Sequence, residues 1–205
     1  EMVVAGDYHP NAADVGNRAL VNRVLSYISR IDGGNQAAAQ YASADNMTQQ
    51  QAALACLLHI GAGQKELAAF AAQWGDDRLV MDKWFGMQVS CAAPNATVQT
   101  AKDLTTHAKF DWKNPNRFRA VIGALGNNAA GFHAPDGTGY AFFADCLIKL
   151  DPMNPQTTAR MATFFDTWKR YSPARQAQMR TELERIKATP NLSPDTTEII
   201  TRILG

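Results

Sequence analysis

The sequence has few cysteines and no cysteine pair at metal-binding spacing. Only three of its 205 residues are cysteine, at Cys56, Cys91 and Cys146, and none forms a C-x-x-C motif. This spacing suggests neither a disulfide framework nor a zinc knuckle, so we expect each cysteine to be a small buried side chain. Unpaired cysteines favour a reducing compartment, and we therefore predict a cytoplasmic location.

Long hydrophobic runs and a large excess of one charge are also absent. No run of about 18 apolar residues occurs, which argues against a membrane partner. Twenty basic and nineteen acidic residues give a formal net charge of +1. Residues 1–100 carry six basic and nine acidic side chains, and residues 101–205 carry fourteen and ten. Because the C-terminal charges alternate in sign, we predict a solvated surface and no nucleic-acid partner.

The common catalytic motifs are missing as well. The chain has no H-E-x-x-H, no G-x-S-x-G and no glycine-rich phosphate loop, and its four histidines never stand four residues apart. We therefore assign no catalytic and no metal-binding residue to this chain. His133 stands alone in a long loop, where a structural hydrogen bond is the favoured role.

Apolar residues recur at helical spacing along most of the chain. Leu20, Val24, Tyr27, Ile28 and Ile31 form one stripe, which predicts a helix with this side buried. The alternation typical of half-buried strands is absent. The sequence thus predicts an all-α fold of about ten helices.

Four helix starts share one local signal, in which a capping side chain directly precedes proline. Asparagine and serine accept hydrogen bonds from the first free amides of a helix, and proline at the next position loses no bond. An apolar stripe of helical period follows each of these pairs. The pairs are Asn114-Pro115, Asn154-Pro155, Ser172-Pro173 and Ser193-Pro194.

The helix lengths and spacing predict one all-α domain over residues 1–205, with residues 1–13 as a linker or domain boundary. Helix pairs about 40 residues apart match HEAT and armadillo units in size, so we expect a right-angled superhelix or solenoid. A compact bundle is the second choice. The one long irregular stretch is predicted at residues 127–138. Because Glu1 precedes Met2, we expect the chain to be either a processed product or an excised piece of a larger protein.

Three polar residues stand where helix physics makes them unexpected. Arg119 follows closely on the Asn114 cap, where the helix dipole disfavours a cation. Gln156 and Arg160 are four residues apart and share one helix face beside the apolar stripe. From the residues alone, Arg160 either pairs with Asp145 or Asp151 or receives an anionic partner such as a peptide carboxylate.

Several segments of the chain resemble one protein family in the same order and at compatible spacing. These segments are Leu79 to Phe85, Asn114 to Arg119, Phe132 to Tyr140, Asn154-Pro155-Gln156 with Arg160, Lys169-Arg170-Tyr171 and Asn191-Leu192-Ser193. They resemble the C-terminal α-helical domain of bacterial aminopeptidase N. The resemblance covers nearly the whole chain and is strongest from Leu79 to Gly205.

The resemblance implies a division of labour within a larger enzyme. Members of the family are zinc aminopeptidases that remove N-terminal residues from peptides, and their H-E-x-x-H and G-x-M-E-N motifs are missing here. It implies zinc in the parent catalytic domain, no cofactor in this chain, and two partners: the catalytic domain of the same polypeptide and the peptide substrate. This chain would close the substrate chamber, with Arg119, Gln156 and Arg160 as substrate-binding residues. Alone it is expected to be inactive.

A different class of function stays open beside this one. A free-standing helical-repeat scaffold would bind a partner protein on its concave face. It would show an exposed apolar or charged groove, and its gene would start near Glu1.

Overall fold

All regular structure that can be described is helical. The computed structural model describes residues 8–205, which form only helices, turns and loops. They belong to two compact units, which divide between Met87 and Gln88. This confirms the predicted all-α class. No helix in the described part is both long enough and apolar enough to span a bilayer.

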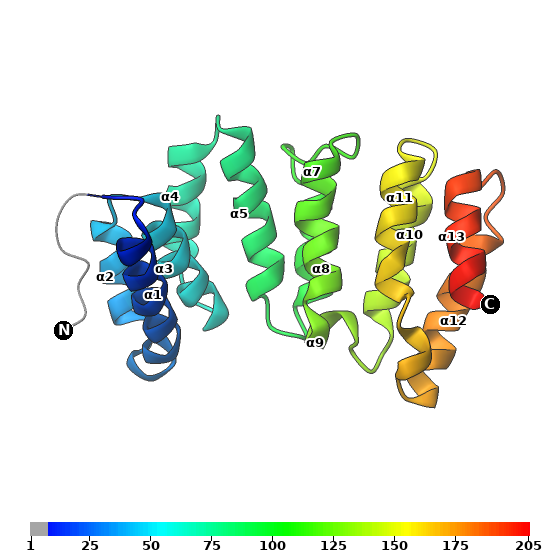
Figure 1. The fold of residues 1–205 in the computed structure, drawn as a ribbon, viewed down its shortest axis with the longest axis horizontal. Helices are drawn as coiled ribbons and strands as arrows, with labels where there is room; N and C mark the ends of the chain where they lie inside the picture. The colour runs from blue at the N-terminus through cyan, green and yellow to red at the C-terminus, as the bar shows by residue number, and fades with distance from the viewer. Residues whose placement is uncertain (1–7) are drawn as a thin grey trace. The chain divides into compact units, whose positions relative to one another are not determined.

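The first unit consists of helices that follow one another in chain order. It contains α1 (Ala12–Asp32), α2 (Asn35–Ser43), α3 (Met47–His59), α4 (Gln64–Trp74) and most of α5 (Arg78–Cys91). Helix α1 packs against α2 and α3, and α3 also contacts α4 (Figure 1). The indole of Trp84 donates a hydrogen bond of 3.1 Å to the carbonyl of Leu67, which ties α5 to α4.

Helix α1 is present as predicted, but four of the five residues of its apolar stripe are exposed and the fifth, Ile28, is half-buried. Leu20, Val24, Tyr27 and Ile31 are exposed, Ile31 by 87% of its surface. The side of α1 that packs inward carries Arg18, Leu25 and Ser29. Leu25 joins a small core with residues of α2 and α3. The periodicity predicted the helix correctly, whereas the predicted burial of the stripe is wrong.

The second unit is built from helices that follow one another in chain order. It contains α6 (Thr97–Thr105), α7 (Pro115–Phe118), η1 (Arg119–Gly123), α8 (Ala124–Asn127), α9 (Ala129–Phe132), α10 (Thr138–Leu150), α11 (Pro155–Ala162), η2 (Thr163–Phe165), η3 (Trp168–Arg170), α12 (Pro173–Lys187) and α13 (Pro194–Leu204). Helix α10 packs against α12, and α11 packs against α13 (Figure 1). This succession of helix pairs is typical of repeat architectures.

An aromatic cluster fills the core of the second unit. The ring of Phe132 lies 5.2 Å from the rings of Tyr140 and Phe143 and 5.8 Å from that of Phe165. Edge-to-face pairs of this kind are favourable beyond the area they bury. The indole of Trp168 donates a hydrogen bond of 2.8 Å to the carbonyl of Ile203, so the C-terminal helix is tied to this core.

The predicted caps are confirmed at three of the four proline pairs. The side chains of Asn114, Asn154 and Ser193 accept hydrogen bonds from the amides of α7, α11 and α13. Ser172 precedes Pro173 at the start of α12, but its side chain makes no capping bond.

Two boundary predictions need adjustment. In the predicted linker 1–13, residues 1–7 lie outside the described part, and α1 already begins at Ala12. The stretch 127–138 is not irregular throughout, because Asn128 caps the short helix α9 and α10 starts at Thr138. The single domain over residues 1–205 stays a prediction.

Candidate functional site

Arg119 opens a π-helical turn between two α-helical segments. Its guanidinium donates to the carbonyl of Pro115 at 3.2 Å and to the side-chain oxygen of Asn116 at 2.5 Å. The side chain is exposed and lies along its own helix. Single π turns interrupt the regular ladder and are frequent at functional sites.

Gln156 and Arg160 lie one turn apart on α11, and both side chains are exposed. Neither side chain bonds to another residue in the described part of the chain. The pairing considered for Arg160 is wrong, because both candidate partners are engaged elsewhere. Asp145 pairs with Arg185 at 2.8 Å, and Asp151 accepts hydrogen bonds from Ser193 and Thr196.

Contacts at two glycines define how α11 lies beside the helix that begins with α7. A Cβ at Gly123 would lie 3.7 Å from Met161, and a Cβ at Gly126 would lie 2.5 Å from the ring of Phe164. Gly126 follows Gly123 by three residues, and Phe164 follows Met161 by three residues. The two helical segments therefore run in the same direction, as Figure 1 shows. Arg119 precedes Gly123 by one turn and is therefore level with the first turns of α11.

The structure thus brings Arg119, Gln156 and Arg160 to the same level of two neighbouring parallel helices. Two guanidinium groups and one amide can donate several hydrogen bonds to a carboxylate or a peptide carbonyl. With no acidic residue bonded to Arg160, its charge is available to an anionic ligand. All three side chains are hydrogen-bond donors, and none of them is a nucleophile.

His133 lies in a separate network of hydrogen bonds. Its Nδ1 is 2.8 Å from the hydroxyl of Tyr140, and its Nε2 is 2.9 Å from the hydroxyl of Tyr171. Arg175 donates to the carbonyl of His133 at 3.0 Å. The predicted structural role of His133 is consistent with these contacts, since both ring nitrogens are occupied.

Burial and charge control the ionisation of this network. Burial first, and the Arg175 charge second, lower the pKa of His133 below 6.5. Burial raises the pKa of Tyr140 to about 12. The histidine is therefore neutral near pH 7, with one ring nitrogen donating and the other accepting. Such a network holds the loop before α10 against α12.

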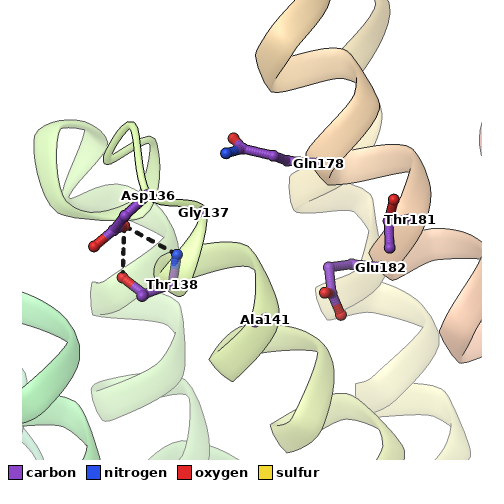
Figure 2. Close-up of a pocket in the computed structure, with 7 residues that line it drawn as sticks. All are labelled: Asp136, Gly137, Thr138, Ala141, Gln178, Thr181 and Glu182. Atoms are coloured by element: carbon purple, nitrogen blue, oxygen red, sulfur yellow. Dashed lines mark hydrogen bonds between the residues drawn. The ribbon is translucent and has the colours of Figure 1, made fainter.

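A groove of about 260 Å³ lies where the loop before α10 faces α12 (Figure 2). Asp136 accepts two hydrogen bonds from Thr138, at 3.0 Å from its amide and 2.8 Å from its hydroxyl. These bonds lower the pKa of Asp136. Gln178 of α12 donates to the carbonyl of Pro135 at 2.9 Å. These polar groups mainly bond the loop to its surroundings, so we assign the groove a structural role.

Metal-ligating side chains do not gather in the part of the chain that the structure describes. Among residues 8–205, no three histidine, cysteine, aspartate or glutamate side chains lie together in a way that could hold a metal ion.

A family model described as "Domain of unknown function (DUF3458_C) ARM repeats" matches residues 1–205. The chain belongs to this family of ARM-repeat domains. The match agrees with the predicted pairs of armadillo-like helices.

Relatives of the chain carry one activity in their names. The chain is 37% identical over 211 residues to aminopeptidase N of Caulobacter vibrioides, and the match covers all of this chain and 24% of the relative. It is 35% identical over 205 residues to aminopeptidase N of Escherichia coli K12, covering 97% of this chain and 23% of the relative. The chain therefore spans about a quarter of the length of these relatives, and its resemblance to aminopeptidase N is confirmed.

A solved structure gives the same result for the fold. The crystal structure of Legionella pneumophila aminopeptidase A in complex with aspartic acid matches with a TM-score of 0.89 and 28% identity. The match covers 98% of this chain and 25% of that one. In these aminopeptidases the matching part is a C-terminal helical domain.

Proposed function

We propose that this chain is the C-terminal helical domain of a zinc aminopeptidase, where it closes the substrate chamber and helps to bind peptides. The observation that carries the proposal is the match of the whole chain to one quarter of aminopeptidase N. The zinc does not fit the described residues of this chain. It would belong to the catalytic part of the same polypeptide.

The residues of this chain would bind and orient the substrate. Arg119, Gln156 and Arg160 lie level with one another on two parallel helices, and the side chains of Gln156 and Arg160 make no bond within the described residues. We infer that they contact the downstream part of a bound peptide, including its carboxylate. Positive charge at a chamber wall also raises the local concentration of anionic peptide ends. The wall itself would admit flexible peptides and exclude folded proteins.

A protein-interaction scaffold is the second candidate, and the outer face of α1 favours it. Leu20, Val24, Tyr27 and Ile31 form an exposed apolar stripe, and such stripes mark surfaces that bind other protein. In the aminopeptidase proposal this stripe would be covered by another part of the same polypeptide. In the scaffold proposal a separate protein would cover it.

The reading frame upstream of Glu1 separates the two candidates. An in-frame H-E-x-x-H with a downstream glutamate would support the aminopeptidase proposal, and the encoded protein should then bind zinc and release N-terminal residues. The 205-residue chain alone should release none. A start codon directly before Glu1 would contradict the proposal and favour the scaffold. Cytoplasmic location stays a prediction; all three cysteines are buried free thiols.

A further inference from the structure

A small cavity in the first unit is lined by two arginines of α1 and a histidine of α3. Its volume is about 130 Å³, and it lies between α1 and the end of α3. The lining residues are Arg23, Ser26, Arg30, Cys56, His59 and Ile60. Two of these six side chains are arginines and one is a histidine, and no acidic side chain is among them.

The α1 side of the cavity presents two arginines on one helix face. Arg23, Ser26 and Arg30 are spaced by three and four residues, so they point in the same direction. Ser26 donates its hydroxyl proton to the carbonyl of Arg23 at 2.7 Å. Burial raises the pKa of the Cys56 thiol, and a hydrogen bond with Ser29 and then the charge of Arg30 oppose that rise.

The α3 side contributes His59. Its Nδ1 lies 2.8 Å from the carbonyl of Ala55, and a carbonyl only accepts, so Nδ1 carries a proton. In the neutral ring Nε2 is then an acceptor, which can bind a phosphate only through a P–OH group of that phosphate. Past the end of α3, the amides of Ile60 and Ala62 donate to the carbonyl of Leu57, and the amide of Gly61 donates to that of Leu58.

The positive charge of this cavity is not neutralised by the described residues. Neither Arg23 nor Arg30 forms an ion pair with a described residue. The guanidinium carbon of Arg23 lies over the ring of Tyr27, 5.7 Å from its centre, and this contact leaves the positive charge in place. The acidic residue closest in sequence to Arg30, Asp32, uses both carboxylate oxygens to accept from the amides of Gly34 and Gln36. The cluster also occurs in the half of the chain where acidic residues outnumber basic ones, nine to six. A general excess of basic residues does not explain it.

We propose that this cavity binds a phosphate-sized oxyanion, held by Arg23, Arg30 and His59. Guanidinium groups bind phosphate through paired hydrogen bonds, and an anion between two like charges relieves their repulsion. A volume of about 130 Å³ is small beside the roughly 300 Å³ at which pockets for larger ligands begin. It suits one oxyanion group, either free phosphate or the phosphate of a small ester.

Titration of the 205-residue chain with inorganic phosphate tests the proposal. Ionic strength is held constant with sodium chloride, and NMR follows the ring of His59 and the arginine Nε–H groups. We expect saturable shifts at these groups. R23Q and R30Q should each weaken binding at least tenfold. R180Q, at an exposed arginine paired with Glu184 in the second unit, should leave it unchanged.

Two outcomes would overturn the proposal: shifts that grow linearly without saturation, or affinities that are equal in R23Q, R30Q and the unsubstituted chain. Because both substituted side chains are exposed, the variants should keep the circular dichroism of the unsubstituted chain. A parallel titration with glycerol phosphate identifies the source of the group. Saturable binding of either ligand supports the proposal, with the tighter one as the source, and binding of neither contradicts it.

Discussion

The carboxylate of Asp151 accepts hydrogen bonds from both the backbone amide and the hydroxyl of Ser193, each at 2.7 Å. The hydroxyl of Thr196 donates a further bond of 2.5 Å to the same carboxylate. Asp151 is only 3% exposed and follows directly on α10, whereas Ser193 caps α13. One buried side chain thus fixes the start of the last helix.

Replacing Asp151 should therefore destabilise the second unit. In Asp151→Ala, the amide of Ser193 and two hydroxyl groups lose their acceptor in a buried place. We expect a loss of about 3 kcal/mol in the free energy of unfolding, measured by denaturant titration. Asp145→Ala, which removes an exposed partner of Arg185, should cost less than about 1 kcal/mol. Equal losses in the two variants would contradict the role given to Asp151.

Two glycines should respond to alanine with opposite signs. A Cβ at Gly139 would lie 2.4 Å from the carbonyl oxygen of Phe132, and backbone cannot yield as a side chain can. Gly139→Ala should cost about 2 kcal/mol or more. Gly16 is exposed within α1 and has open space around its Cβ position, so Gly16→Ala should stabilise by about 0.5–1 kcal/mol. Thermal unfolding of both variants measures the two effects, and a gain at Gly139 would refute the predicted clash.

The stabilising effect of His133 should depend on pH. Because its pKa is lowered below 6.5 in the folded chain, the unfolded chain takes up the proton first as the pH falls. The stability that the neutral ring provides is therefore complete above pH 6.5 and decreases below it. Denaturant titrations at several pH values should show the advantage over His133→Gln shrinking on acidification. A constant advantage would count against this ionisation.

Local patterns carried most of the fold prediction. Asn114, Asn154 and Ser193 begin helices because their side chains satisfy the first amides, and this depends only on neighbouring residues. The direction in which α1 faces depends on what packs against it. Its periodic stripe predicted a helix, but Leu25 rather than Ile31 lies in the core.

Local sequence patterns predicted less of the candidate site than of the fold. The spacing of Gln156 and Arg160 placed them on one helix face, and the helix confirms that. That Arg119 lies at the same height along its helix as these two residues depends on the contacts of Gly123 and Gly126 with the neighbouring helix. Such contacts between distant parts of the sequence leave no local pattern. The same holds for the bonds between His133 and Tyr171, which are 38 residues apart in the sequence.

The most direct test of the proposed function is the substrate dependence of Arg160→Ala in the complete enzyme. If Arg160 binds the downstream end of a peptide, kcat/KM for short peptides should fall about tenfold, the loss of roughly one charge-assisted hydrogen bond. For uncharged aminoacyl amides, which lack that carboxylate, the change should stay within about twofold. Arg180→Ala, at an exposed arginine of the same unit, serves as the control and should affect neither substrate. Equal losses of kcat/KM on peptides and amides in Arg160→Ala would contradict the account.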